Sequence, residues 1–521
     1  MDTKALKQKI LDLAIRGKLV PQDPNDEPAS VLLEKIRAEK QQMVKDGMLK
    51  SKDLKNDTVI FVGEDNLHYE KFSDGTIKCL KDEIPFEVPA GWIWCRLKNI
   101  STTNIGLNYH PEDINDQGVA VLRSNNIKDN VIDYSDLVKV NCAIKDNQYL
   151  NNHDILICSR NGSKNLVGKC AVYEGGPERF SFGAFMAVLR TSLYEYVYYY
   201  LLTNVFRKLF HSDDSKQINQ VTQTILKEAL IPLPPFQEQS RISSAIKSLF
   251  SYVDSFDANK KELTEIVSQT RSKILDLAIR GKLVPQDSDD EPATVLLERI
   301  RRKKEELIKA GKLKRDKRES VIFRGEDNSY YEKLMGSSIE KQIKIPFDLP
   351  NGWVWVRGRD CFSGMTNTIP TGIDFDYIDI DSIDNREHKI TKPKHLNVSD
   401  APSRAKRAVY TGSVLFSLVR PYLQNIARVS EKHKDCIAST GFYVCNSNGV
   451  LSSEYLFYLM ISPYVVNGLN QFMKGDNSPS INKDDIENWL YPIPPLKEQK
   501  RITYQIEKLL TQITKIASAL K

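Results

Sequence analysis

The stretch Lys9-Ile-Leu-Asp-Leu-Ala-Ile-Arg-Gly-Lys-Leu-Val-Pro-Gln-Asp23 decides the fold, because it recurs letter for letter at 273–287. Further segments return in the same order at nearly the same offset, which excludes chance. These pairs are Glu27–Glu34 with Glu291–Glu298, Gly63–Asn66 with Gly325–Asn328, Ile84–Trp94 with Ile345–Trp355, and Pro232–Ile242 with Pro492–Ile502. The chain is therefore an internal duplication.

The segments between these repeats do not repeat. Residues 98–230 and 358–490 share little beyond weak echoes. A duplication that drifted evenly would have lost similarity everywhere. Two preserved frames around two different inserts indicate two heads that do the same kind of job on different targets.

Residues 236–281 carry a heptad pattern that predicts one helix on the order of 65 Å long. Apolar side chains recur there in steps of four and three at Ile242, Ile246, Leu249, Val253, Phe256, Leu263, Val267, Ile274 and Leu277. The C-terminal tail matches the first half of this series, at Ile502, Ile506, Leu509, Ile513, Ile516 and Leu520. The N-terminus matches the second half, at Leu6, Ile10 and Leu13. We expect the two chain ends to meet and to pack together, antiparallel, on the central helix; ordinary two-helix packing without a spacing role remains the alternative.

The predicted fold class is α+β: two mixed α/β heads separated by an antiparallel helical, coiled-coil frame with a pseudo-two-fold internal repeat. The expected boundaries are 1–83 for the first frame segment and connector, 84–235 for head one, 236–344 for the central frame and connector, 345–495 for head two, and 496–521 for the last frame segment. The alternating tryptophans of Trp92-Ile-Trp94 and Trp353-Val-Trp355 are expected on one face of a strand, as core anchors. One helix is expected to close each head, at Tyr194–Phe210 and at Glu454–Phe472.

Polar loops between the predicted strands hold the candidate contact residues. Arg, Asn and Gln side chains pair bidentately with base edges, whereas Lys and Ser serve phosphates. In head one the candidates are Arg123, Ser124, Asn125, Asn126, Arg160, Asn161, Ser163, Lys164, Asn165, Lys216 and Gln217. In head two they are Arg420, Tyr422, Gln424, Asn425, Lys474, Asn477, Ser478 and Ser480. Each alone also fits a solvated loop residue; their gathering at matching places in both heads favours nucleic acid.

The composition fits a cytoplasmic protein. Net charge is +6, with 41% hydrophobic and 27% charged residues, which permits a polyanionic partner without demanding one. No apolar run approaches the roughly 20 residues of a membrane helix. The eight cysteines lack metal-ligand spacing, which favours reduced thiols.

No catalytic motif emerges. Adenine-N6 methyltransferases need Asn or Asp before Pro-Pro-aromatic, but Leu233 precedes Pro234-Pro235-Phe236. The sequence shows no glycine-rich turn for a methyl donor and no phosphate-binding loop for ATP. The acidic segment Asp374–Asp384 offers a metal or nuclease site as an alternative, but surface turn acids are the favoured interpretation.

The framing motifs resemble those of a known family, the specificity subunits of type I restriction–modification systems. The resemblance lies in the IPF…PxGWxW motif that opens each head, the PxPPxxEQxRI motif that closes it, the AIRGKLVPQD helix ends and the segment Asp154-Ile-Leu-Ile-Cys-Ser-Arg-Asn-Gly162. It covers nearly the whole chain and is weaker in the inserts.

The resemblance implies two target-recognition domains, each of which reads one half of a bipartite double-stranded DNA site. It also implies two methyltransferase subunits docked on the helical frame, and restriction subunits that carry the motor and nuclease. S-adenosylmethionine, ATP and Mg²⁺ are then expected on those partners, and neither catalytic nor metal-ligating residues are carried over to this chain. The rival hypotheses are a self-contained DNA methyltransferase or nuclease, and a purely structural coiled-coil adaptor.

Overall fold

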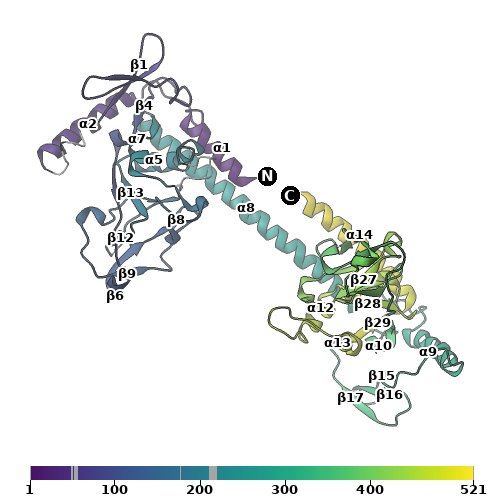
Figure 1. The fold of residues 1–521 in the computed structure, drawn as a ribbon. Coiled ribbons are helices and arrows are strands. Elements are labelled where there is room, and N and C mark those ends of the chain that lie inside the picture. The colour runs from purple at the N-terminus through teal and green to yellow at the C-terminus, as the bar shows by residue number, and fades with distance from the viewer. Residues whose placement is uncertain (1, 48–50, 52–56, 177, 211–219, 520–521) are drawn as a thin grey trace. The chain divides into compact units, whose positions relative to one another are not determined.

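The computed structural model describes the chain except residues 1, 48–50, 52–56, 177, 211–219 and 520–521 (Figure 1). The chain divides into two compact units, Met1–Asn259 and Lys260–Lys521. Each unit combines a pair of frame helices, a small connector module and one head. The units correspond in most of their elements, as the sequence duplication predicts.

In the first unit, helix α1 (Thr3–Ile15) packs on the first half of the long helix α8 (Phe236–Ile279). Lys7 Nζ lies 2.5 Å from Asp254. Farther along, Gln22 Nε2 donates to Glu238 at 3.1 Å. From Lys7 to Gln22 the contacted residue on α8 moves back from Asp254 to Glu238, so the two segments run antiparallel. The 44 residues of α8 give a length of about 66 Å at roughly 1.5 Å per residue.

In the second unit, helix α14 (Leu496–Ala519) packs on the second half of α8 in the same sense. Arg271 donates to Thr514 at 3.1 Å, and Gln286 donates to Glu498 at 3.0 Å. The predicted antiparallel frame is thus confirmed within each unit.

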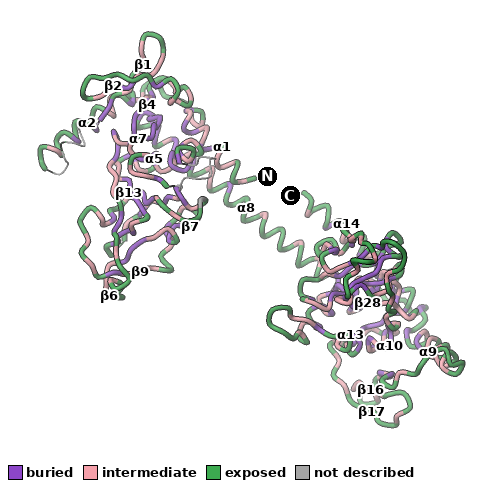
Figure 2. Tube along the Cα trace, viewed as in Figure 1, coloured by how far each residue is buried: buried purple, intermediate pink, exposed green. Residues whose placement is uncertain are grey.

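The heptad seam is packed at its two ends only. Ile242 and Ile246 are fully buried, and Ile274 is nearly so. Figure 2 shows much of the middle of α8 exposed, and there Phe256 is 46% exposed and Leu263 is 44% exposed. The heptad positions are thus buried where α1 and α14 pack on α8, and Phe256 and Leu263 between these two contacts are about half exposed.

The two motifs that frame each head pair with each other. Strand β4 (Ile93–Arg96) runs antiparallel to β14 (Leu230–Leu233), with Trp94 opposite Pro232. In the second unit β18 (Val354–Arg357) pairs likewise with β29 (Leu490–Ile493), with Trp355 opposite Pro492. Each head is thus an insertion that begins and ends at one two-stranded ladder.

The residues that repeat in the sequence make the same contacts in both units. The buried Glu238 carboxylate accepts hydrogen bonds from Trp92 Nε1 at 2.9 Å and from Gln22 at 3.1 Å. Beside it Arg241 pairs with Asp26 at 2.5 Å. A buried carboxylate needs such donors, so these positions constrain one another. The same contacts recur among Glu498, Trp353, Gln286, Arg501 and Asp290.

The tryptophan prediction is half right. All four tryptophans are buried core anchors. However, Trp92 precedes β4 and packs in the frame core, whereas Trp94 lies in the strand and packs against Leu80 and Leu230. The expectation that they share one strand face is wrong, because the two-residue alternation of a strand does not extend to a residue in the preceding turn.

The predicted connectors contain an ordered module in each unit. The first holds α2 (Ala29–Lys45) and the sheet β1 (Val59–Val62), β2 (His68–Lys71) and β3 (Ile77–Cys79). The second holds α9 (Ala293–Lys309), β15 (Ser320–Arg324), β16 (Tyr330–Leu334) and β17 (Glu340–Ile343). No heptad or alternation pattern in the sequence had predicted these sheets.

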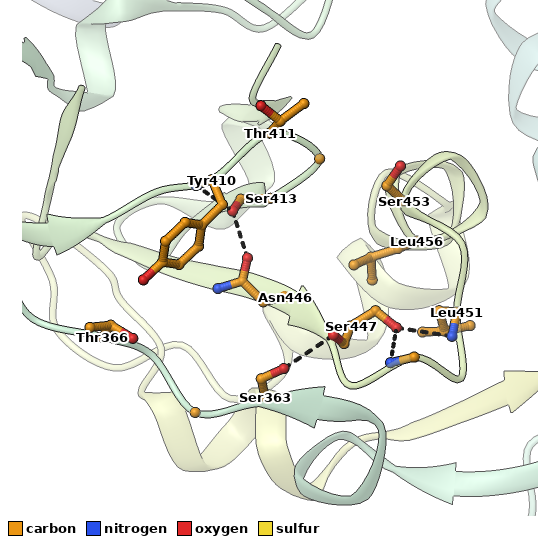
Figure 3. A pocket seen from close by; sticks show the side chains of 13 residues that line it. Ser363, Thr366, Tyr410, Thr411, Ser413, Asn446, Ser447, Leu451, Ser453 and Leu456 are labelled. Atoms are coloured by element: carbon orange, nitrogen blue, oxygen red, sulfur yellow. Dashed lines mark hydrogen bonds between the residues drawn. The ribbon is translucent and has the colours of Figure 1, made fainter. Parts of the chain in front are cut away.

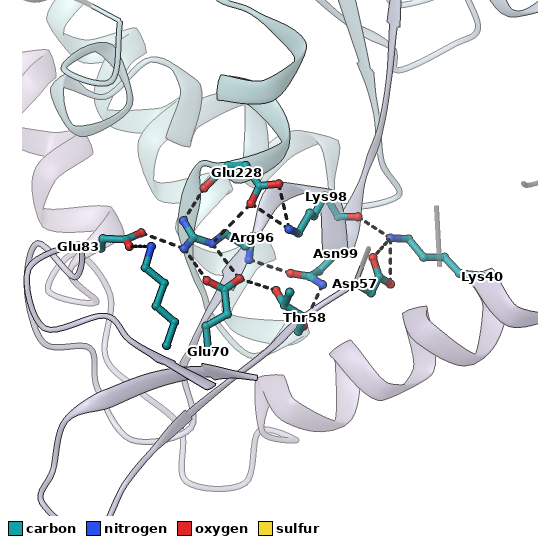
Figure 4. Close-up of polar contacts among 10 residues, drawn as sticks. Lys40, Asp57, Thr58, Glu70, Glu83, Arg96, Lys98, Asn99 and Glu228 are labelled. Carbon is teal, nitrogen blue, oxygen red and sulfur yellow. Dashed lines mark hydrogen bonds and ion pairs between the residues drawn. The ribbon is translucent and has the colours of Figure 1, made fainter. Parts of the chain in front are cut away.

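A charged network joins the first module to the ladder (Figure 4). The guanidinium of Arg96 contacts Glu70 at 2.6 Å and Glu83 at 2.9 Å, and Glu70 accepts from Thr58 Oγ1. These bonds lower the pKa of Glu70 against the opposing effect of burial. Lys40 and Lys98 extend the network to the helix.

The heads share most of their topology although their sequences diverge; the second sheet of head two has one additional edge strand. Head one has a sheet in the order β11-β10-β13-β5 and a second sheet β12-β6-β9; head two has β26-β25-β28-β19 and β24-β27-β20-β23. In both second sheets one pair is parallel, β12 with β6 and β27 with β20.

The strands of head one are β5 (Thr102–Ile105), β6 (Ile114–Leu122), β7 (Ile127–Lys128), β8 (Val131–Ile132), β9 (Val138–Val140), β10 (Ile155–Cys158), β11 (Cys170–Val172), β12 (Phe180–Phe182) and β13 (Met186–Arg190).

The strands of head two are β19 (Phe362–Ser363), β20 (Asp374–Ile378), β21 (Ile383–Asp384), β22 (Lys389–Ile390), β23 (Lys394–Asn397), β24 (Ala405–Ala408), β25 (Val414–Ser417), β26 (Ile426–Arg428), β27 (Ile437–Ser439) and β28 (Phe442–Ser447). Short helices flank the ladders in both units. They are α4 (Leu97–Ile100), α7 (Gln223–Glu228), α10 (Gly358–Cys361) and α13 (Lys483–Asn488).

The single helix expected in each head is two helices. Head one has α5 (Tyr194–Leu201) and α6 (Asn204–Arg207), and head two has α11 (Ser453–Met460) and α12 (Pro463–Asn470). The hydroxyls of Thr203 and Ser462 cap the second helix of each pair. A capping hydroxyl starts a new helix, and Pro at the first helical position reinforces that start in head two.

Candidate nucleic-acid interface

The first candidate loop, 123–126, follows strand β6 as a single 3-10 turn. Asn126 is buried, accepts from Arg123 N–H at 2.9 Å, and donates to the carbonyls of Asp133 and Asp136 at 3.0 and 2.8 Å. Its side-chain amide therefore stabilises the loop through internal hydrogen bonds. We remove Asn126 from the candidate contacts, because a buried side chain with these internal bonds does not reach a ligand.

Arg123 and Asn125 share an acidic partner. Arg123 Nη2 lies 3.2 Å from Asp136 Oδ2, and Asn125 Nδ2 donates to the same oxygen at 2.9 Å. Asn125 is exposed, whereas Arg123 and Ser124 are half-buried. Asp136 therefore holds both donors in one place at the surface.

The second candidate loop, 160–165, lies against the first. Asn161 Nδ2 donates to Ser124 Oγ at 3.0 Å. Arg160 is exposed, and its guanidinium lies 6.0 Å from the ring centroid of Phe185, which is itself 62% exposed. Sequence analysis missed Phe185, although an aromatic residue in the turn before β13 was a visible signal.

Other predicted residues of head one are placed less fully. Ser163 and Asn165 are exposed in the same loop. Lys216 and Gln217 lie outside the described residues, and so does the side chain of Lys164. Arg160 forms a β-bridge with Gln220, which follows that segment directly.

In head two, candidate loop 420–425 joins β25 to β26. Arg420 and Gln424 adopt left-handed backbone conformations, with φ of +47° and +55°. Bulky residues in that region are uncommon and gather at functional sites. Arg420, Tyr422 and Gln424 are exposed, and Asn425 is half-buried.

The loop from Lys474 onward lies beside the 420–425 loop. Arg420 Nη2 donates to Asn477 O at 2.8 Å, and Arg420 N–H donates to Pro479 O at 2.8 Å. Lys474 and Ser480 exchange two backbone hydrogen bonds of 3.0 Å, which closes a small hairpin. Lys474, Asn477 and Ser478 are exposed at its tip, and Ser480 is half-buried. The structure thus brings all head-two candidates together.

Comparison of the two heads shows a further turn at an equivalent position. It lies in the acidic segment Asp374–Asp384, which was interpreted above as surface turn acids. Asp379–Ser382 follows β20 in head two, at the position that 123–126 occupies after β6 in head one. Asp379 N–H donates to Ser382 Oγ at 3.1 Å, as Arg123 N–H donates to the Asn126 side-chain oxygen at 2.9 Å. Lys394 lies 2.9 Å from Asp381. The structure places an acidic turn in head two where head one has a basic one.

A polar pocket of about 490 Å³ lies between the end of β19, the turn 410–413, the end of β28 and α11 in head two (Figure 3). Its polar groups bond to one another: Ser363 Oγ donates to Ser447 O at 3.1 Å, and Ser447 Oγ accepts from Leu451 N at 3.0 Å. No charged side chain lines it. Because its groups are satisfied internally, we assign it no ligand.

The residues that the structure describes form neither a metal-ligand cluster nor a membrane-spanning helix. Within those residues, no three side chains of His, Cys, Asp or Glu gather as metal ligands would. In the same part of the chain, no helix combines the length and apolar character needed to cross a bilayer.

Comparison with known proteins gives a consistent family. Residues 89–266 and 368–520 match the family described as type I restriction modification DNA specificity domain. The chain is 26% identical to the type I restriction enzyme EcoAI specificity subunit of Escherichia coli, over 99% of this chain and 90% of that protein. It is 28% identical to the EcoKI specificity subunit of Escherichia coli strain K12, over 81% of this chain and 83% of that protein.

A solved structure shares the fold. Its title describes complex assembly and conformational transition of the type I R-M system, and it superposes with a TM-score of 0.52 at 16% identity, over 84% of this chain and 94% of that chain. The family match extends over more than half of the chain, in both of its units. The chain belongs to the family of type I restriction–modification DNA specificity proteins.

Proposed function

We propose that this protein is the sequence-reading subunit of a type I restriction–modification complex, in which each head recognises one half of a bipartite double-stranded DNA site. One observation carries the proposal. Two heads of matching strand order, apart from one additional strand in head two, present polar loops at equivalent strand ends, and those loops differ in their residues. Equal scaffolds with different loops are what two half-sites of different sequence require, because base edges are read by side chains and not by the fold.

The duplicated frame supports the partner assignment. The contacts of Glu238 with Trp92 and Gln22 recur at Glu498, so each unit presents the same helical frame. Two identical frames suit two copies of one partner, and we propose that these are the methyltransferase subunits. Restriction subunits with the motor and nuclease complete the complex.

We further propose that this chain performs no turnover. S-adenosylmethionine, ATP and Mg²⁺ would then bind to the partner subunits. The purified chain, incubated with DNA and each of these cofactors, is expected to neither methylate nor cleave it. Modification or cleavage by the chain alone, free of the partner subunits, would support the rival enzyme hypothesis.

Arg420→Ala is expected to weaken binding to one half-site by about 1–3 kcal/mol, the range for loss of a bidentate base contact. The guanidinium is exposed, and the Asn477 carbonyl fixes its direction. Fluorescence anisotropy with duplexes altered in either half-site measures the effect.

Arg160→Ala is the matched control, because Arg160 occupies the equivalent loop of head one. It is expected to weaken recognition of the other half-site. Equal loss of both half-sites in each variant would indicate a folding defect and would contradict the assignment of one half-site to each head.

Enrichment of random-sequence DNA on the complex separates DNA recognition from the adaptor hypothesis, which predicts no enriched motif.

A further inference from the structure

A cleft of about 980 Å³ lies within the second unit, between the frame helices and head two. The turn between β21 and β22, the end of β26, helices α11 and α12, and one face of α8 and α14 form its walls. Four cationic side chains line it, against one carboxylate, Glu387. The cations are Arg271, Arg386, Lys389 and Arg428.

Part of this charge is already paired within the protein. Arg428 contacts Glu454 at 2.7 Å, and Lys389 lies 3.6 Å from Glu387. Arg386 is exposed and forms no salt bridge with any described residue. The cleft therefore keeps an excess of positive charge that an incoming anion can meet.

The turn that carries Arg386 is held in place before any ligand arrives. Asp384 Oδ1 accepts from Arg386 N–H at 2.9 Å. Asn385 Nδ2 donates to Leu423 O at 2.8 Å, which ties the turn to the 420–425 loop. His388, at a φ of +52°, contacts the carbonyl of Ile426 through Nδ1 at 3.2 Å. A fixed turn loses little conformational entropy on binding.

The cleft is continuous with the candidate DNA-reading loop. Gln424 belongs to that loop and also lines the cleft, whose opposite wall includes Arg271 of α8. A duplex read by residues 420–425 would thus carry its sugar–phosphate backbone past the opening. Arginine matches phosphate oxygens in geometry and charge.

The first unit contains the corresponding cavity with the opposite charge. It is lined by the turn between β7 and β8, the end of β11, helix α5 and helix α8. Its charged side chains are Glu174, Glu195 and Lys247, and Val172 stands where Arg428 stands in the second unit. The first-unit cavity is smaller, about 550 Å³, and differs from the second-unit cleft above all in the charge of its lining.

We propose that the second-unit cleft is a phosphate-binding site for the DNA backbone, and that the first unit has no counterpart. The proposal rests on the proposed DNA recognition and refines it: contact with the backbone next to the site is asymmetric. Arg386 supplies unpaired charge, Lys389 adds a cation that also contacts Glu387, and the cleft adds affinity without reading bases.

The test uses the full chain co-expressed with the methyltransferase subunit, and a duplex that carries the recognised motif. The dissociation constant is measured by anisotropy over a series of salt concentrations. Each phosphate contact removed lowers the magnitude of the slope of log K against log salt by about 1. That decrease is expected for Arg386→Ala and for Lys389→Ala, with the preference between half-sites unchanged.

Lys247→Ala in the first-unit cavity is the matched control, and its slope is expected to equal that of the wild type. Wild-type binding with unchanged slopes in both second-unit variants overturns the cleft assignment alone. An equal decrease for Lys247→Ala overturns the asymmetry. A wild-type complex that does not bind the motif duplex overturns the proposed function, and this inference with it.

A second titration separates the source of the phosphate. A deoxynucleoside monophosphate is added to wild type and to Arg386→Ala without DNA. Weaker mononucleotide binding by the variant, together with an unchanged DNA slope, would assign the cleft to a free nucleotide and contradict the backbone assignment. A decreased DNA slope without saturable mononucleotide binding supports it.

Discussion

Trp355→Ala is expected to lower the free energy of unfolding of the second unit by about 3–5 kcal/mol, the range for removing a buried aromatic side chain. Trp355 is almost completely buried in the ladder that opens and closes head two. Its ring packs on Phe347 and Tyr464, with centroids 4.8 and 6.1 Å away. Truncation leaves a cavity between the ladder and the connector sheet.

Hydrogen exchange of peptides from β18 and β29 measures this loss separately from the first unit. Trp355→Phe is the control: it keeps an aromatic ring and removes an indole N–H that lacks a hydrogen-bond partner among the described residues. We expect it to cost markedly less than alanine. A loss below about 1 kcal/mol for Trp355→Ala would contradict the role of this ladder as the closure of the head.

Asp360→Asn is expected to stabilise the second unit at neutral pH by up to about 3 kcal/mol. Burial raises the pKa of the Asp360 carboxyl from 3.8 to about 6, although Arg359 and the hydrogen bonds from Ser320 oppose the rise. One of its oxygens is buried without a hydrogen-bond partner. The first unit carries Asn99 at this position, where the amide donates to Thr58 O at 3.0 Å.

The direction of the pH dependence follows from this raised pKa. Between pH 3.8 and about 6 the folded state binds more protons at Asp360 than the unfolded state does, so this group lowers stability as pH rises through that window. Above the window the full cost is present, and below pH 3.8 it vanishes. Denaturant unfolding of wild type and Asp360→Asn at pH 4, 6 and 8 checks it. A difference that does not grow with pH would contradict the buried, charged carboxylate.

The frame could be predicted from the sequence because its contacts are duplicated. Glu238 needs both Trp92 and Gln22, so the positions could not drift independently, and the repeat remained readable. The topology of the heads could not be predicted. The apolar run Ile155–Cys158 does predict a strand, but it is short and buried on both faces, so it gives no sign of which strands it pairs with.

The candidate site was predicted at the level of loops and not of individual residues. Polar residues after strand ends located the loops. The residue type alone does not show whether a side chain points into the protein or toward the solvent. Asn126 faces in, because it supplies the bonds that fold its own turn. The cleft around Arg386 joins segments far apart in sequence, so no local spacing could have shown it.

The most direct test of the central claim is a single-molecule methylome of the host with and without this gene. The account predicts that deletion removes adenine methylation from one two-part motif with a fixed gap, and that Arg420→Ala reduces it there. An unchanged methylome, in a host whose methyltransferase subunit is shown to be expressed, would contradict the proposed recognition function.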